Sequence, residues 1–373
     1  MTTYRFLQPL DVLFLRGNKL FGDPGSFGES LVPPWPSVAA GALRSQVLAA
    51  DGVDLHAFAA GRVVHPTLGT PARPGPFTVT AFHLARRGDD DTIEALYVAP
   101  ADLMLTRDDG DRLTVTRLIP RPLEPGLAAS AALPQLAVLP ERERRKPVGG
   151  FWLTQAGWER YLNGGTLGAG EFETSGRLWQ FDARVGVGLH PEQHSADDGK
   201  LFSSQAVAPA PGVGFLVGVT GAEPPASGTL RLGGDGRGAA VQRVAFDPPQ
   251  PGLAAIVAAR RCRIVLTTPG IFPDGWRLPG VDAERRFNLH GVSGTLICAA
   301  VPRAETISGW DLAAWQPKAA QRAAPTGSVY WLTDLEASTE ALRHLLRIGL
   351  WPASDGQHQR RAEGFNRFSF ACY

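Results

Sequence analysis

The sequence is poor in cysteine and in long apolar runs, and each shortage excludes a class of protein. The three cysteines, Cys262, Cys298 and Cys372, are widely spaced and form no CxxC pair, so neither a zinc knuckle nor a disulfide framework is supported. No run approaches the roughly 18 apolar residues that cross a bilayer, and no secretory leader is recognisable. We therefore expect a cytoplasmic protein without a membrane partner.

Lysine is also scarce. Lysine and arginine total 37 residues against 36 acids, which gives a net charge of +1, so the sequence lacks the global basicity of many nucleic-acid binders. Only four of the 37 are lysine, leaving 33 arginines. A GC-rich genome explains this bias, but arginine also suits bidentate phosphate contacts and stacking on bases.

Motifs for nucleotide hydrolysis and metal binding are missing or weak. No GxxxxGK[ST] loop occurs, and "GGDGRG" at 233–238 is read either as a tight hairpin turn or as a loop whose bare backbone approaches phosphate beside Arg237. His190 and His194 are four apart in "HPEQH", but the "SADDGK" that follows indicates a loop. The sequence therefore predicts no metal ion and no cofactor.

The element pattern predicts an α+β protein. "TYRFLQPLDVLFL" indicates a strand, and Pro9 suggests that it lies at a sheet edge or a bulge. Ser37 is the expected N-cap of a helix over 38–49. Strands are expected in "PFTVTAFHLAR", "IEALYVAP" and "DRLTVTRLI", and a short helix in "TQAGWERYLNGG". Residues 120–150 show no steady period, which indicates an insertion or mobile connector.

The later part of the chain continues this alternation. "GVGFLVGVTG" and "GTLRLGG" are expected to pair as strands, followed by a glycine turn into "AAVQRVAF". Beyond 250 the order is helix, three strands, helix and a last strand. With roughly 100 to 200 residues per domain, we predict two ferredoxin-like (RRM-like) domains with antiparallel sheets and loop insertions, residues 1–250 and 251–373.

Basic clusters recur beside aromatic residues. They are "ERERRK" at 141–146, "RRCR" at 260–263, "ERR" at 284–286 and "QRR" at 359–361, and Phe287 and Phe365 are close to two of them. Each cluster alone is typical of a solvated face. Together they are compatible with single-stranded RNA, which is commonly held by base stacking and backbone charge.

Several segments in order resemble the third subunit of the Cmr complex, the type III-B CRISPR effector of antiviral defence, within the RAMP superfamily. They are "PLDVLFLRGNKLFG", "PPWPSVAAGALRSQV", "RVGVGLHPEQHSADDGKLFSS", "LRLGGDGRGAAV", "TPGIFPDGW", "ISGWDL" and "QPKAAQRAAPTGSVYWL". The resemblance implies a non-catalytic, RNA-binding subunit of a ribonucleoprotein. Such a subunit binds the 5′ repeat-derived tag of the CRISPR RNA and contacts the large polymerase/cyclase-type subunit and the repeated backbone RAMP subunit.

The resemblance also assigns candidate RNA-binding residues, and no catalytic residue. They come from the loop after the first strand, the first helix, the glycine-rich loop and the "PK...R" segment: Arg16, Lys19, Arg44, Gly233, Gly234, Gly236, Arg237, Gly238, Lys318 and Arg322. The alternative is a metal-independent RAMP endoribonuclease that processes CRISPR repeat RNA, with His290 of "FNLHGVSG" as general base.

Overall fold

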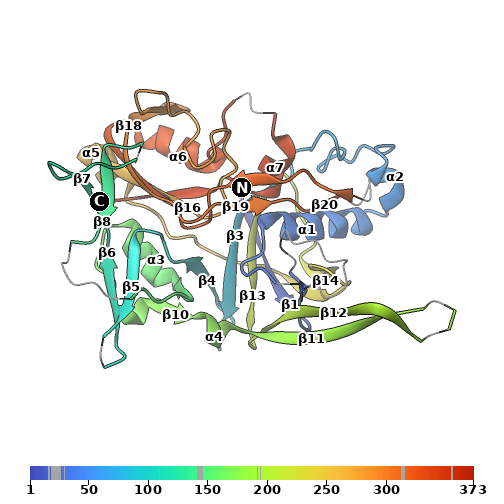
Figure 1. Ribbon diagram of the computed structural model, residues 1–373. Coiled ribbons are helices and arrows are strands. Elements are labelled where there is room, and N and C mark those ends of the chain that lie inside the picture. Colours follow the sequence, from blue (N-terminus) through green and yellow to red (C-terminus); the bar gives the residue numbers. More distant parts are fainter. Residues whose placement is uncertain are drawn as a thin grey trace.

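The computed structural model describes residues 1–15, 17, 27–28, 30–108, 110–130, 132–140, 146–190, 192–193, 195–311, 316–353 and 356–373. Two large antiparallel sheets dominate it, one below the other in Figure 1. One is built from residues 3–244 and the other from residues 262–371. The α+β class and the mainly antiparallel pairing agree with the prediction.

The first sheet places the N-terminal strand in its interior. Its order is β10 (Phe172–Thr174), β9 (Phe151–Leu153), β4 (Ile93–Val98), β3 (Thr78–Arg87), β13 (Val213–Thr220), β1 (Thr3–Pro9), β15 (Gly238–Val244) and β14 (Ser227–Arg231). The predicted edge position of β1 is wrong. Pro9 is tolerated because it is the last residue of β1, so its missing N–H falls at the end of the ladder.

The pairing expected between residues 213–220 and 227–231 is also wrong. These segments are β13 and β14, and both β1 and β15 lie between them. β14 pairs instead with β15, from Ser227↔Gln242 to Arg231↔Gly238. The glycine-rich segment is therefore the turn of a β14–β15 hairpin, which agrees with the tight-turn interpretation.

The second sheet has the order β17 (Arg286–Leu289), β18 (Val292–Ala300), β23 (Val329–Glu336), β16 (Cys262–Leu266) and β24 (Phe368–Ala371). Helices α5 (Leu253–Ala259) and α6 (Thr339–Ile348) contribute buried leucines and isoleucine to its core. Ser338 caps α6 by accepting a hydrogen bond from the N–H of Ala341. The order α5, β16, β18, β23, α6 and β24 agrees with the order expected from the sequence, whereas β17 was not expected.

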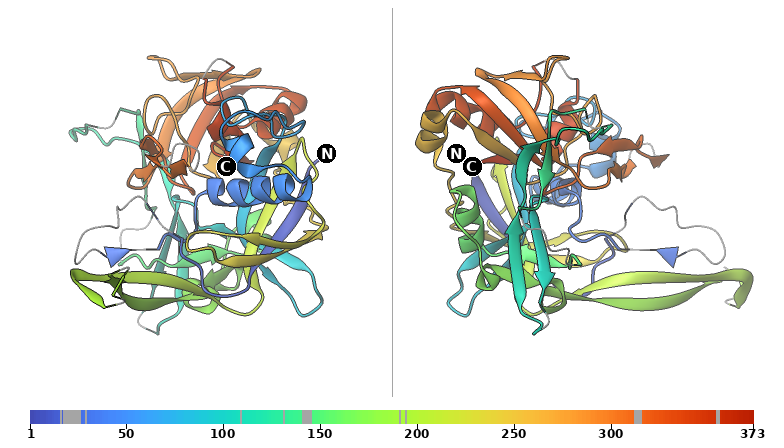
Figure 2. Two further views of the ribbon diagram at one scale, coloured as in Figure 1. Left: turned by 90° about the vertical axis from the view of Figure 1, so that its right-hand side faces the viewer. Right: turned by 60° about the vertical axis from the view of Figure 1, so that its left-hand side comes forward.

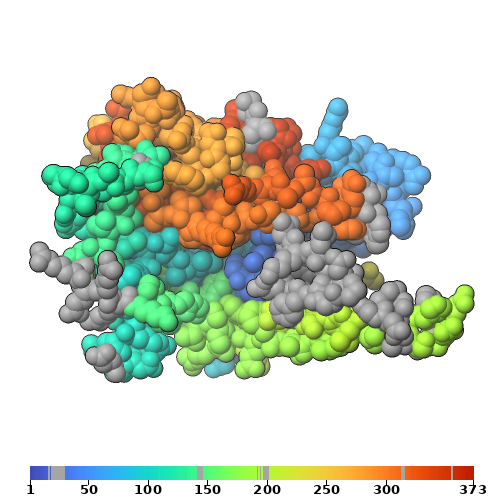
Figure 3. Space-filling model, viewed as in Figure 1, coloured from blue at the N-terminus to red at the C-terminus, as the bar shows by residue number. Residues whose placement is uncertain are grey.

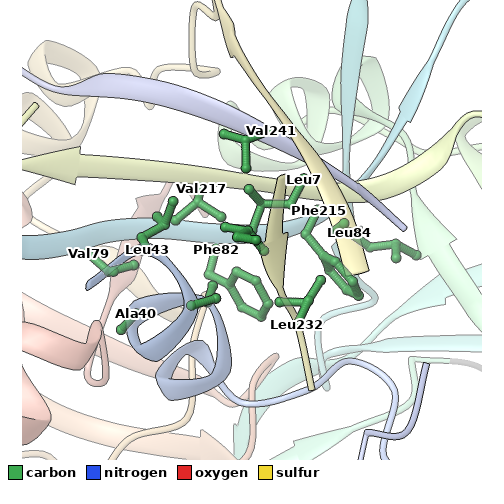
Figure 4. Close-up of a cluster of buried hydrophobic side chains, with 14 of the residues drawn as sticks. Leu7, Ala40, Leu43, Val79, Phe82, Leu84, Phe215, Val217, Leu232 and Val241 are labelled. Atoms are coloured by element: carbon green, nitrogen blue, oxygen red, sulfur yellow. The ribbon is translucent and has the colours of Figure 1, made fainter. Parts of the chain in front are cut away.

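Helix α1 (Pro36–Ala50) covers the outer face of the first sheet. Ala40 and Leu43 of α1 pack with Phe82 of β3 and Phe215 of β13 in the same cluster (Figure 4). The predicted N-cap is wrong, because Trp35 is the N-cap and its side chain makes no capping hydrogen bond. Pro36 occupies the first turn, where a missing N–H costs nothing, so the helix begins before Ser37.

The inner face of the first sheet packs against the second sheet. Their shared core contains Phe6 and Leu216 from one sheet and Val265 and Trp331 from the other. A fully buried ion pair crosses this joint. Arg263 of β16 donates from Nη1 to Asp102 at 2.5 Å, both side chains being 0% exposed. This joint fixes the two sheets relative to each other.

Smaller elements extend from the sheets. A long ribbon of β11 (Trp179–Leu189) and β12 (Ala196–Pro209) projects beyond the body (Figures 1 and 2), and β2 (Phe27–Gly28) pairs with β12. Other two-stranded pairs are β5 (Leu103–Arg107) with β6 (Leu113–Arg117), β7 (Ile119–Pro122) with β8 (Gln135–Val138), β19 (Glu305–Ile307) with β22 (Gln321–Ala323), and β20 (Trp310–Asp311) with β21 (Gln316–Pro317).

The ribbon and the β7–β8 pair differ from the expectations. Residues 120–150 were expected to form a connector, yet part of them pairs in β7 and β8. The expected loop after His194 is also wrong, because β12 begins at Ala196. The remaining helices are α2 (Leu55–Ala59), α3 (Gln155–Leu162), α4 (Ser175–Leu178), α7 (His358–Glu363) and a 3₁₀ turn at Ala169–Glu171. No helix within the described ranges has the length and apolar content of a membrane span.

Candidate nucleic-acid interface

The segment after β1 runs beside the glycine turn. Arg16 and Lys19 themselves lie outside the described residues. The residues just before them are held by bridges from Leu13 to Val207 of β12 and from Phe14 to Gly234. Two segments that the sequence separates by more than 200 residues, and that both carry candidate RNA-binding residues, are therefore adjacent.

Close approach of Phe14 explains one glycine of the turn. Gly233 has φ +77°, and a Cβ built on it would lie 2.8 Å from the carbonyl oxygen of Phe14. The N–H of Gly234 donates to that oxygen at 2.8 Å. Gly236, with φ +65°, has open space around an added Cβ. Gly238 begins β15, and its carbonyl accepts from the N–H of Leu10. A protein contact thus accounts for Gly233, while Gly236 faces open space.

Arg237 is held by protein groups. Its Nη1 donates to Oδ2 of Asp11 at 2.7 Å, and Nη2 lies 3.4 Å from Oδ2 of Asp235. Its guanidinium carbon is 5.3 Å from the centre of the Phe14 ring, and that of Arg184 in β11 is 5.8 Å from the same ring. Arg184 pairs in turn with Asp182. Each arginine here is offset by a carboxylate, so Arg237 must exchange Asp11 for a phosphate before it binds RNA.

Two other candidates meet at a different place, which we call the junction cluster: Arg44, Lys318, Arg360 and Glu363. Glu363 at the end of α7 is only 3% exposed, and Lys318 donates to its Oε1 at 2.8 Å. Arg360 lies 3.1 Å from its Oε2. Three cations and one carboxylate leave a charge of +3 − 1 = +2. The cluster lies where α1 and α7 meet the arm of β19 to β22, coloured orange across the face shown in Figure 3.

Arg44 is the least compensated member of the junction cluster. Its guanidinium lies 5.2 Å from the centre of the Phe77 ring and makes no hydrogen bond or ion pair to any described residue. Burial lowers the pKa of Arg44, and the nearby Glu363 partly offsets this effect. No described carboxylate forms an ion pair with Arg44, so its guanidinium has donors to offer a ligand.

Arg322 lies beside the junction cluster on β22. Its side chain is exposed and has no ion pair within the described part of the chain. The neighbouring Gln321 accepts from Nε of Arg360 at 2.8 Å, and Arg360 Nη2 donates to the carbonyl of Ser308. The guanidinium of Arg360 is therefore occupied by contacts that hold α7 against the arm. Arg44 and Arg322 have no ion pair to a described residue.

Several residues of the basic and aromatic clusters are not available to RNA. Phe287 and Phe365 are both 0% exposed, so the stacking role considered for them is wrong. Arg263 of "RRCR" was read as part of a solvated face, but it is buried against Asp102. Alternate side chains of a strand point to opposite faces, and the sequence alone did not show which face of β16 and β17 is covered.

His290 has a structural environment. It forms, with Gly291, the turn between β17 and β18, at φ +50°, and its Nε2 lies 2.7 Å from the carbonyl oxygen of Trp351. That contact requires Nε2 to be protonated, which leaves Nδ1 as the nitrogen that could accept a proton. The nearest ring partner is His344, with centroids 6.0 Å apart. No described acid is hydrogen-bonded to His290.

His190 of "HPEQH" lies at the tip of the ribbon. His190 follows the last residue of β11 and its N–H donates to the carbonyl of Ser195, whereas His194 lies outside the described residues. No group of three or more potential metal ligands occurs in the described ranges.

The ribbon itself is a feature that the sequence interpretation missed. One face exposes a row of large apolar side chains, including Val185 at 72%, Leu189 at 55% and Leu201 at 59% exposed. The available signal was the alternation in "WQFDARVGVGL", which has the period of a strand. Gly186 and Gly188, between the apolar residues, obscured the pattern.

Comparison with solved structures gives a fold likeness over the full length. A chain in the structure described as "Cryo-EM structure of the Type III-B Cmr-beta bound to cognate target RNA and AMPPnP, state 1" matches with a TM-score of 0.51 and 12% identity, covering 98% of both chains. A chain of "Cryo-EM structure of the Type III-B Cmr-beta bound to cognate target RNA" matches with a TM-score of 0.47 and 13% identity, covering 88% of this chain and 86% of that one.

A search of curated protein sequences finds no match. A family model matches nearly the whole chain, from residue 5 to residue 369. This span includes every candidate RNA-binding residue and nearly all of both large sheets. The chain therefore belongs to the family of CRISPR-associated proteins called Cas_Cmr3.

Proposed function

We propose that this chain binds the 5′ repeat-derived tag of the CRISPR RNA and caps one end of the effector complex, without catalysing RNA cleavage. The observation that carries this proposal is the pair of uncommitted arginines, Arg44 and Arg322, next to the Lys318 site. Guanidinium donors without a carboxylate partner are suited to phosphate oxygens. A tag held in one conformation requires such donors but no acid or base.

The near-neutral charge of the chain is compatible with this role. A subunit of an assembly shares its RNA with neighbouring subunits, so effective concentration replaces strong individual attraction. We infer that the neighbours are the large polymerase/cyclase-type subunit and the repeated backbone RAMP subunit. Solved structures with this fold come from complexes described as bound to target RNA, which supports RNA as a ligand of the assembly.

We also infer that residues 1–250 and 251–373 are two ferredoxin-like domains. Strand order supports this assignment. The strands β1, β3, β13 and β15 of the first sheet can be numbered one to four along the chain. Across the sheet they then lie side by side in the order 2-3-1-4. β16, β18, β23 and β24 of the second sheet repeat that order. The ferredoxin-like motif combines such a sheet with crossover helices, and α1 and α6 occupy two of those crossovers.

The proposal is tested by the salt dependence of RNA binding. The change is the combined substitution of Arg44→Ala, Lys318→Ala and Arg322→Ala. For a single-stranded RNA with the 5′ end of the guide that co-purifies with the complex, each lost phosphate contact should lower the slope of log affinity against log salt by about 0.7. Arg343→Ala, which removes an exposed arginine of α6, is the control and should leave the slope unchanged.

Two outcomes would refute the proposal. One is an unchanged slope in the triple variant. The other is cleavage of repeat RNA at one site by the purified protein, abolished by His290→Ala, because it would make the chain a nuclease. Co-purification of a small RNA with a constant 5′ end is the expected accompanying result.

A further inference from the structure

Arg367 is a buried cation whose charge no described carboxylate offsets. It lies between α7 and β24, and its side chain is 5% exposed. Its Nη1 donates to the carbonyl oxygen of Arg347, near the end of α6, at 2.9 Å. Nε is enclosed without a hydrogen-bond partner, whereas Nη2 is not enclosed and has no partner among the described residues. One donor of this guanidinium is therefore anchored, and Nη2 remains for a ligand.

The main chain around Arg367 is held in place. The preceding Asn366 has φ +59°, and its Nδ2 donates to the carbonyl oxygens of Ile271 at 3.2 Å and Leu350 at 3.0 Å. The N–H of Arg367 donates to Oγ1 of Thr268 at 3.0 Å. A guanidinium on a backbone fixed in this way needs little further ordering when a ligand binds.

Arg361 brings a second cation to the same place, and we call Arg361 and Arg367 the arginine pair. Arg361 lies on α7 and is half-buried, and its side chain has no hydrogen bond or ion pair in the part of the chain that the structure describes. Burial, together with the like charge of Arg361, lowers the pKa of Arg367 to about 10, so Arg367 remains charged at neutral pH. Two neighbouring cations without an acid are suited to an anion.

A structural role accounts for only part of this arrangement. A cation near the C-terminus of a helix interacts favourably with the helix dipole, and the bond from Nη1 to Arg347 gives Arg367 that role at the end of α6. It gives no role to Nη2 or to Arg361. By contrast, Arg360, the neighbour of Arg361 in the chain, uses its donors on protein groups. The arginine pair therefore has donors that the described contacts do not use.

The arginine pair lies next to the junction cluster. Arg360 and Glu363 of that cluster are three residues apart on α7 and share one of its faces. Arg361 is turned by about 100° from Arg360 around the helix axis, so one short helix carries cations of both groups on different faces. An RNA backbone repeats a negative charge at every nucleotide, and it fits such a series of cations better than a single carboxylate does.

We propose that the arginine pair binds a phosphate group of the RNA, at a nucleotide different from those held by the junction cluster, so that the backbone passes over α7. This inference deepens the proposed function and rests on it. Nη2 of Arg367 and the guanidinium of Arg361 donate to the non-bridging oxygens of that phosphate. Such contacts position RNA without reading its sequence, so the arginine pair fixes the path of the strand beyond the junction cluster.

The test is a methylphosphonate scan of the RNA. Full-length protein is titrated with synthetic single-stranded RNAs that carry the 5′ end of the co-purifying guide, each with one phosphate replaced by an uncharged methylphosphonate. In the wild-type protein, the sensitive positions should weaken binding by about tenfold, because each loses a charge-assisted contact. Arg361→Ala should abolish the effect at one of these positions and lower the slope of log affinity against log salt by about 0.7. The triple variant of the junction cluster and Arg322 should retain the effect at that position.

Two more variants complete the test. Arg112→Ala removes an exposed arginine that pairs with Asp108 in the turn between β5 and β6, and it should reproduce the wild-type scan and slope. Arg367→Lys keeps the charge but loses the planar fork of donors, so intact RNA should bind several-fold more weakly with an unchanged slope. Wild-type affinity in Arg367→Lys would exclude Nη2 from the contact.

The outcomes distinguish this inference from the proposed function. A wild-type slope and scan in Arg361→Ala, with a lower slope in the triple variant, would overturn the arginine pair and leave the proposed function standing. If no RNA binds, or if the triple variant also keeps the wild-type slope, the proposed function is overturned as well.

Discussion

A substitution of Glu363 should change the stability of the protein and its affinity for RNA in opposite directions. Glu363 is 3% exposed, and its two carboxylate oxygens accept from Lys318 at 2.8 Å and Arg360 at 3.1 Å. Glu363→Gln keeps the shape of the side chain and one acceptor oxygen, but removes the negative charge. The charge of the junction cluster then rises from +2 to +3, because its three cations lose their only carboxylate.

The two expected effects have opposite signs. Charge-assisted hydrogen bonds contribute about 1.5 to 3 kcal/mol each, and the amide NH₂ would face a cation where the second oxygen was. The free energy of unfolding should therefore fall by about 2 to 4 kcal/mol. RNA affinity should nevertheless rise, and the salt slope should steepen by about 0.7, because Lys318 becomes free to contact one more phosphate.

Urea unfolding measures the first effect and fluorescence anisotropy of labelled RNA over a salt series measures the second. Glu223→Gln is the matched control. Glu223 accepts at 2.6 Å from the buried Arg5, but it belongs neither to the junction cluster nor to the contacts of Arg237. It should lower stability and leave the salt slope unchanged. A Glu363→Gln protein that is less stable but has an unchanged or shallower slope would show that Lys318 does not face RNA.

Two further predictions concern the body of the protein. Arg263→Met should lower the free energy of unfolding by about 3 to 5 kcal/mol, because it leaves the buried carboxylate of Asp102 without its cation. Adding Asp102→Leu should recover most of the loss. A loss below about 1 kcal/mol in the single variant would contradict this interpretation. Because burial lowers the pKa of His83 from 6.5 to about 4, the unfolded chain binds the extra proton between these values, so stability should rise as pH increases from about 4 to 6.5. Urea midpoints at pH 4.5 and 7 should show a smaller rise in His83→Phe, and an equal rise in both proteins would exclude this histidine.

Local patterns were sufficient for some features that depend on neighbouring residues. They predicted the short helix at residues 154–165 and the glycine turn into β15, whereas the local prediction of Ser37 as the N-cap of α1 is wrong. Partners distant in the chain were not predictable in this way. The place of β1 between β13 and β15 depends on ladders to residues more than 200 positions away. A strand pattern gives the alternation of faces but not the neighbours.

The candidate site shows the same division. The resemblance selected Arg44, Lys318 and Arg322, which the fold brings to one region, and Arg237, which it brings elsewhere. No sequence pattern indicated that Glu363, one acid within "RRAEGF", would be the shared partner of two cations. The sequence also did not indicate that β4 leaves β3 after Leu96 and pairs with β9 from Tyr97.

Whether Arg237 contacts RNA can be tested by substituting its partner Asp11 instead of Arg237 itself. Asp11 is 58% exposed, and exposed ion pairs contribute only about 0 to 1 kcal/mol, so a phosphate that offers stronger, charge-assisted bonds can displace it. If RNA does so, Asp11→Asn removes the competitor, and RNA affinity should increase a few-fold in anisotropy titrations, with a salt slope steeper by about 0.7. Asp108→Asn, which frees an exposed arginine in the β5–β6 hairpin, should change neither quantity. If Asp11→Asn also changes neither, Arg237 holds Phe14 and the glycine turn together and contacts no RNA.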